Sequence, residues 1–149
     1  MTTKVEMVSV VIPTLNEAGN ILETVTTIHK EIAYPKEIIV VDGNSTDGTK
    51  EIVKDTNFCK LIVESRRGYG LALRTGIKHA KGDVVVMVDG DGTYDVKRIN
   101  LLIDALIRND AELCQATRMY DLRKAMGFTN FVANKIITFC FDFFYSQFL

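Results

Sequence analysis

The sequence has no tryptophan, two prolines, two histidines and three cysteines among its 149 residues. Cys59, Cys114 and Cys140 lie far apart, and no pair has CxxC spacing. An odd number of dispersed cysteines argues against a complete disulfide framework and favours a reducing compartment. Both histidines fall in expected helices without partners in the pattern, so we assign them no chemistry.

Long apolar runs are also missing. No stretch reaches the ~18 apolar residues that a membrane-spanning helix needs. The first apolar run, MVSVVI, stops at Pro13, so we expect no secretory signal there. A net charge of −1 gives no indication of nucleic-acid binding.

The length and the composition suit one domain with a core of its own. Hydrophobic residues make up 47% of the chain and charged residues 25%. Aromatic residues are distributed unevenly, because seven of the eight phenylalanines lie in the range 128–148. The chain ends at Leu149 without a polar tail, and we expect a truncated protein with a core at 1–125 and an apolar aromatic helix at 126–149.

Apolar, β-branched runs alternate with patterns of helical period. Uniformly apolar strands separated by helices predict an α/β fold, in which a mainly parallel sheet has helices on both faces. The expected strands are 8–12, 37–42, 60–64, 83–89 and 112–118. The expected helices are 17–32, 49–54, 71–80 and one marked by apolar residues from 96 to 106.

Polar residues follow every expected strand. In parallel α/β sheets, ligands bind beyond the carboxyl ends of the strands. The polar groups are therefore expected to converge on one edge of the sheet. They are 13–17, 42–47, 65–70, 89–95 and Arg118.

Asp89 and Asp91 follow the fourth strand with one glycine between them. Two carboxylates roughly 5 Å apart repel by about 3 kcal/mol at an effective dielectric constant of 20, and a cation removes that cost. Hard oxygen ligands with open positions suit Mg²⁺ or Mn²⁺ together with a substrate phosphate. Gly90 and Gly92 leave room for a ligand near the backbone. The alternative is a solvated Asp-Gly turn, but the other polar strand ends favour the metal–diphosphate interpretation.

Other ligand motifs are weaker or absent. No GxxxxGK[ST] sequence occurs, and neither possible register fits a calcium-binding EF-hand loop. Arg66 and Arg67 either lie beside an anionic ligand or begin a helix in solvent. Asp42 and Asp47 either accept a hydrogen bond from a base or cap a helix, and Glu17 can equally be a helix N-terminal acid.

Four motifs in series resemble the family 2 glycosyltransferases with the GT-A (Rossmann-like) fold. They are VVIPTLNEAGNI, IIVVDGNSTDGT, RRGYGLALRTGIKHAKGD and VVVMVDGDGTYD. Within that family, TLNEAGNI, DGDGTYD and GFTNFVANKIITFCFDFF are most similar to dolichyl- or polyprenyl-phosphate sugar synthases.

The resemblance implies a role for each matching residue. Asp89 and Asp91 would bind the divalent cation (Mg²⁺ or Mn²⁺), and Arg118 would approach a phosphate of the donor or the acceptor. These three would be the catalytic residues. The nucleotide-sugar pocket would comprise Pro13, Leu15, Glu17, Val41, Asp42, Gly43, Asp89, Gly90 and Asp91.

The implied reaction is inverting transfer of a hexose from a UDP- or GDP-sugar to a dolichyl or polyprenyl phosphate, as used in protein glycosylation. A lipid phosphate is already an anionic nucleophile, so the lack of histidines is no objection. Two alternatives stay open: a glycan or polysaccharide acceptor, and a nucleotide-sugar-binding fragment without activity.

The segment 126–149 would begin the acceptor-facing and membrane-facing region. It is too short to span a bilayer, and its aromatic residues suit a membrane interface. We therefore expect a cytoplasmic protein at the cytoplasmic face of a membrane. The alternative is a core helix or a dimer helix, and with it a homo-oligomer.

Overall fold

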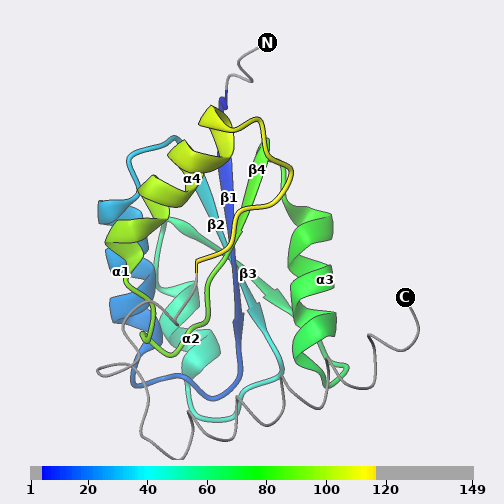
Figure 1. Cartoon of the computed structure of the whole chain (residues 1–149). Helices are drawn as coiled ribbons and strands as arrows, with labels where there is room; N and C mark the ends of the chain where they lie inside the picture. Colours follow the sequence, from blue (N-terminus) through cyan, green and yellow to red (C-terminus); the bar gives the residue numbers. More distant parts are fainter. Residues whose placement is uncertain (1–4, 117–149) are drawn as a thin grey trace, which may run out of the picture. The chain divides into compact units, whose positions relative to one another are not determined.

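In the computed structural model, four parallel strands lie at the centre of the described part of the chain, residues 5–116. The strand order is β3-β2-β1-β4 (Figure 1). The elements follow one another as β1 (Val8–Thr14), α1 (Ile21–Glu31), β2 (Lys36–Asp42), α2 (Thr49–Lys54), β3 (Cys59–Val63), α3 (Tyr69–His79), β4 (Val84–Met87), the 3₁₀ turn η1 (Val96–Arg98) and α4 (Ile99–Arg108). This alternation confirms the predicted α/β class with a parallel sheet.

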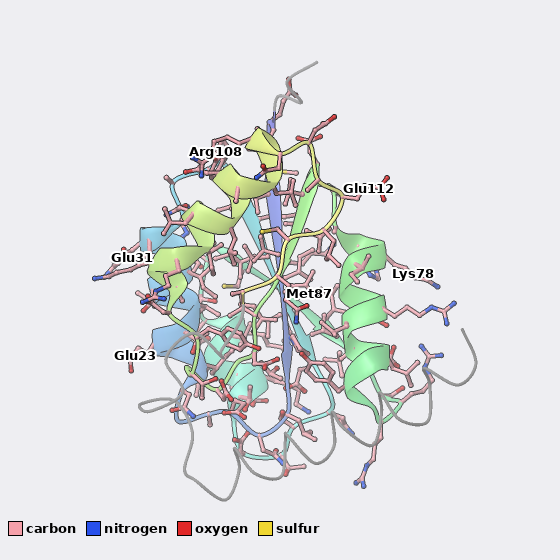
Figure 2. All side chains as sticks on the ribbon, viewed as in Figure 1. Glu23, Glu31, Lys78, Met87, Arg108 and Glu112 are labelled. Atoms are coloured by element: carbon pink, nitrogen blue, oxygen red, sulfur yellow. The ribbon has the colours of Figure 1, made fainter. Side chains whose placement is uncertain are left out.

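Helices cover both faces of the sheet, which explains why every position of β1 and the last five positions of β2 are buried. Val10 and Ile12 of β1 pack in a large core with α1 and α4, whereas Val11 faces α3 in a smaller one. Figure 1 shows α1 and α4 on one side of the sheet and α3 on the other. On the outer surfaces of α1 and α3, Glu23 and Lys78 point away from the strands (Figure 2).

Helix α3 packs very close to the sheet because Gly76 has no side chain. A Cβ atom at this position would lie 2.3 Å from Cγ1 of Val11 and 3.0 Å from Cγ2 of Val41. Such distances are far shorter than ordinary contacts between carbon atoms. The glycine therefore fixes the distance of α3 from β1 and β2, and with it the position of the helix N-terminus beside the strand ends.

The structure corrects two of the predicted elements. Helix α1 begins at Ile21, because residues 17–20 form a turn that loop contacts hold outside the helix. The fifth strand, predicted at 112–118, is absent from 112–116, which have no regular structure. Arg118 lies outside the described residues.

The aromatic segment 126–149 and the domain boundary predicted at 125 also lie outside the described residues. Within 5–116, none of the helices combines the length and the apolar character required to cross a bilayer.

Candidate functional site

The loops that follow β1 and β2 are tied together at the carboxyl edge of the sheet. The backbone N–H of Asn16 donates to Oγ of Ser45 over 2.8 Å, and the N–H of Thr46 donates to Oδ1 of Asn16 over 3.0 Å. Asn16 has a φ of 58°, a left-handed conformation that asparagine tolerates better than most residues. The two loops consequently form one surface.

A second link joins these loops through Asp47. Its Oδ2 accepts the N–H of Ala18 over 2.9 Å, while its Oδ1 accepts from the hydroxyl and the N–H of Thr49, the first residue of α2. The hydroxyl of Thr49, followed by the Ala18 N–H, holds the pKa of Asp47 below its ordinary value. The hydroxyl of Thr49 also accepts the N–H of Glu17 over 2.9 Å. Asp47 thus ties the two loops to the first residue of α2, although the N-cap position of that helix is Gly48.

Three residues of the predicted nucleotide pocket that lie on β1 and β2 are buried. Pro13 and Val41 are paired with each other in the ladder between β1 and β2, and the Val41 side chain belongs to the core beneath α3. Asp42 is fully buried, and its oxygens accept from the N–H and the hydroxyl of Ser45 over 2.8 and 2.5 Å. These buried side chains pack beneath the surface at the carboxyl edge of the sheet.

Other predicted pocket residues lie at the surface of the same edge. The Leu15 side chain is 57% exposed. Gly43 adjoins it, since a Cβ at Gly43 would lie 3.6 Å from Cδ1 of Leu15. Glu17 is partly exposed, and its carboxylate accepts from Nδ2 of Asn20 over 3.2 Å. An open, partly apolar shelf therefore follows β1 and β2.

Gly90 is buried rather than open to a ligand. A Cβ at this position would lie 2.6 Å from Cγ2 of Thr14, which ends β1. The carbonyl of Gly90 accepts the hydroxyl of Thr24 in α1 over 3.3 Å. We expected this glycine to leave space for a ligand, but the structure shows that packing against Thr14 requires it. Gly92, with a φ of 74°, provides the left-handed turn of the loop.

The two aspartates of the site lie on either side of Gly90. Oδ1 of Asp89 accepts the hydroxyl of Tyr69 over 2.7 Å. Oδ1 of Asp91 accepts both the N–H and the hydroxyl of Thr93, over 3.0 and 2.8 Å. Tyr69 and Thr93 are neutral donors, so these hydrogen bonds orient the two carboxylates without neutralising them.

Tyr69 comes from the first turn of α3 and connects that helix to the end of β4. Its hydrogen bond to Asp89, then partial burial, and then the nearby negative charges raise the pKa of Tyr69 to about 12. The phenol is consequently protonated at neutral pH and acts as a hydrogen-bond donor. We predicted no role for this residue from its sequence context.

Glu64 forms a separate cluster after β3. Its two oxygens accept Nε and Nη2 of Arg66 over 2.9 and 2.8 Å, and Oε2 also accepts the hydroxyl of Thr75 over 2.7 Å. These interactions, led by the Arg66 hydrogen bonds, lower the pKa of Glu64 to about 2. Arg66 is thus held by a buried carboxylate, whereas Arg67 is exposed to solvent.

A cleft of about 340 Å³ lies between α1 and residues 88–97. Asp89, Asp91 and Tyr94 line one wall, and Asn20, which precedes α1, and Thr24 of α1 line the other. The volume is within the range of small-molecule sites. Both aspartates therefore border an open space, while the shelf after β1 and β2 lies outside this cleft.

The donor set fits a cation that shares its coordination with a substrate. Residues 5–116 contain no group of three or more His, Cys, Asp or Glu side chains able to hold a metal ion. Asp89 and Asp91 nonetheless offer hard oxygen atoms, and Mg²⁺ typically binds one or two carboxylates, substrate phosphates and water. The residues present thus suit a site completed by a diphosphate, and not a closed structural metal site.

Sequence reasoning missed Tyr69, Ser45 and Glu64. Tyr69 reaches Asp89 across 20 positions of sequence, and only the fold brings the two together. Ser45 was visible as part of NSTDGT, and an Asp-x-x-Ser spacing is a recognisable turn signal. Glu64 was assigned to a strand, and nothing in its local sequence indicates burial against Thr75.

Comparison with known proteins gives a consistent result. The profile described as "Glycosyl transferase family 2" matches residues 9–132. The glycosyltransferase AglJ of Haloferax volcanii is 33% identical over 144 residues, which is 95% of this chain and 46% of that protein. The undecaprenyl-phosphate 4-deoxy-4-formamido-L-arabinose transferase of Aeromonas hydrophila is 33% identical over 71% of this chain and 35% of its own length. The chain thus spans less than half the length of these relatives.

Solved structures are also similar. The mannosyltransferase PcManGT of Pyrobaculum calidifontis, in complex with GDP-Man and Mn²⁺, has a TM-score of 0.60 and 33% identity over 70% of this chain and 33% of that one. The glucosyl-3-phosphoglycerate synthase of Mycobacterium tuberculosis, in complex with Mn²⁺ and UDP, has a TM-score of 0.61 and 27% identity over 68% and 40%. These neighbours confirm the GT-A fold.

Proposed function

This chain belongs to glycosyl transferase family 2, and from that premise we propose that it transfers a hexose from a nucleoside-diphosphate sugar to a dolichyl or polyprenyl phosphate, with inversion at the anomeric carbon. The observation that carries the proposal is the placement of Asp89 and Asp91. Both follow β4 at the carboxyl edge of the sheet, and both border an open cleft.

The donor would lie along this edge. Its nucleoside would rest on the shelf formed by Leu15, Glu17 and Gly43, and its diphosphate would extend toward Asp89 and Asp91. Pro13, Val41, Asp42 and Gly90 would hold this surface from below, since each is buried. GDP-Man and UDP in the similar structures support binding of a nucleotide, and the Mn²⁺ in both supports a divalent cation.

In the proposed step, an oxygen of the acceptor phosphate attacks C1 of the hexose. The bond between C1 and the donor's β-phosphate oxygen breaks on the opposite face, and its electron pair leaves with the nucleoside diphosphate. A divalent cation bound at Asp89 and Asp91 would supply positive charge to the departing diphosphate. The attacking phosphate is already an anion, so the step requires no general base.

Two observations support a lipid phosphate as the acceptor: the name of a similar enzyme and the composition of the segment 126–149. A similar enzyme is an undecaprenyl-phosphate transferase, and the aromatic segment 126–149 suits a membrane interface. We propose that the protein acts at the cytoplasmic face of a membrane and that Arg118 approaches a phosphate there. A second candidate acceptor is a small phosphorylated acid, because a similar structure holds phosphoglyceric acid together with Mn²⁺ and UDP.

The test begins with donor binding to the full chain. UDP- and GDP-sugars are screened by thermal shift with Mn²⁺, and the donors that bind are then incubated with dolichyl phosphate or with phosphoglyceric acid. Transfer of labelled hexose to the lipid supports the proposal, and transfer to the acid selects the second candidate. Binding without transfer to either acceptor identifies a nucleotide-sugar-binding module, and failure of every donor to bind refutes the proposed site.

A further inference from the structure

We propose that Tyr69 is a positioning residue that holds the carboxylate of Asp89 in the orientation required for cation binding. The inference rests on the proposed function, because it assumes that Asp89 binds the cation. Its evidence is separate: a hydrogen bond of 2.7 Å joins the phenol to Oδ1 of Asp89 across the strand ends.

The position of Tyr69 is fixed by the fold. The residue begins α3, and α3 is held against β1 through the close contact of Gly76 with Val11. Asp89 follows β4, whose last paired residue, Met87, is in register with Val11. The elements that carry the two ends of the hydrogen bond are therefore both packed against the same central strand, β1.

Exposure of the ring argues against a role in the core. Tyr69 is 60% exposed, so its ring contributes little apolar burial. A hydroxyl directed from such a ring to one carboxylate oxygen mainly limits the rotation of that carboxylate. Among residues 5–116, no side chain donates to Oδ2 of Asp89, which leaves this oxygen available to a ligand.

The chemistry gives the direction of the effect. Carboxylates that bind metals are commonly hydrogen-bonded through their other oxygen, and removal of such a partner typically costs 10- to 100-fold in metal affinity. With Tyr69 in place, Oδ1 of Asp89 is occupied by the phenol hydroxyl, and Oδ2 is the oxygen left for a ligand. Without the hydroxyl, the carboxylate can rotate, and the cation must order it on binding.

The experiment compares two tyrosine-to-phenylalanine changes in the full chain. Tyr69→Phe removes the hydrogen bond to Asp89 and keeps the ring. Tyr34→Phe is the matched control, because Tyr34, in the loop between α1 and β2, donates to Oδ1 of Asp104 in α4 over 2.5 Å, away from the carboxyl ends of the strands. Thermal stability is measured against Mn²⁺ concentration at fixed UDP and at fixed GDP, and again without metal.

We expect Tyr69→Phe to raise the Mn²⁺ concentration for half-maximal stabilisation by about tenfold, with the full shift restored at high Mn²⁺. Tyr34→Phe should lower the melting temperature at every Mn²⁺ concentration without changing the half-maximal value. If both variants behave alike, or if Tyr69→Phe leaves the half-maximal value unchanged, the inference is wrong and the proposed function stands. If the wild-type chain shows no Mn²⁺-dependent shift with either nucleotide, both fail together.

Discussion

Replacement of Gly90 by alanine should distort the site, because the new methyl group would overlap with the buried end of β1. The new Cβ would lie 2.6 Å from Cγ2 of Thr14, 3.5 Å from Cδ1 of Ile21 and 3.6 Å from the carbonyl oxygen of Pro13. The first distance is about 1 Å shorter than an optimal contact between carbon atoms. Thr14 is β-branched and buried, so its methyl group has little freedom to move away.

The expected cost follows from this overlap. Overpacking of a buried site typically costs about 1 to 3 kcal/mol. For a chain of this size, about 4 °C of melting temperature corresponds to 1 kcal/mol, so Gly90→Ala should lower the melting temperature by roughly 4 to 12 °C. Because Asp89 and Asp91 flank the substituted residue, Mn²⁺-dependent nucleotide binding should weaken as well.

A double-mutant cycle isolates the overlap. Thr14→Ser removes Cγ2, the atom closest to the new methyl group, and keeps the hydroxyl. Gly90→Ala should therefore cost much less stability in the Thr14→Ser background than in the wild-type chain. Gly70→Ala is the control, because a Cβ at Gly70 has no neighbour within 4 Å; it should be neutral or stabilise by up to about 1 kcal/mol in helix α3. Wild-type stability of Gly90→Ala, or no recovery in the double variant, would refute this account.

Three further predictions concern charge at the strand ends. Asp91→Asn keeps an oxygen that can accept from Thr93 but removes the negative charge, so calorimetry should show loss of Mn²⁺-dependent nucleotide-sugar binding with an unchanged melting temperature; unchanged binding would contradict the metal assignment. Chelation of divalent cations with EDTA should abolish the stabilisation by nucleotide sugars in the wild-type chain, and excess Mn²⁺ should restore it; stabilisation that persists in EDTA would rule out a metal-dependent site. The pKa of Glu64 is lowered from 4.5 to about 2, so its stabilising contribution is present above pH 4.5 and is lost as the pH falls through about 2. Urea unfolding should therefore show that the wild type exceeds Glu64→Gln by a constant amount above pH 5, and that the difference shrinks toward pH 2; a difference independent of pH would exclude the Arg66 pair as its cause.

The regular elements were predictable because their signals are local. Apolar runs bounded by polar residues identified β1 to β4, and α2 at Thr49–Lys54 was predicted to the residue. The start of α1 was wrong because a tertiary contact decides it. Backbone N–H groups of residues 16–18 donate to side chains of the loop after β2, which keeps this segment out of the helix. No pattern within 17–32 contains that information.

The glycines show the same limit. Nothing in the sequence around Gly76 or Gly90 indicates that a side chain would be excluded there, yet both glycines are required by close contacts with β1. We attributed Gly90 to ligand approach because the sequence showed only its neighbours along the chain. The contact with Thr14 is separated from it by 76 positions and exists only after the sheet forms.

The carboxylates at the strand ends were alike in the sequence, and the structure distinguishes them by their partners. Glu64 is paired with the cation Arg66. Asp42 and Asp47 accept hydrogen bonds from loop residues that they organise. Asp89 also accepts from a neutral donor, the phenol of Tyr69, but unlike Asp42 and Asp47 it borders the cleft. A carboxylate that is oriented but not neutralised is suited to bind a cation. The case for a metal site therefore rests more on the position of Asp89 and Asp91 beside the cleft than on their spacing in the sequence.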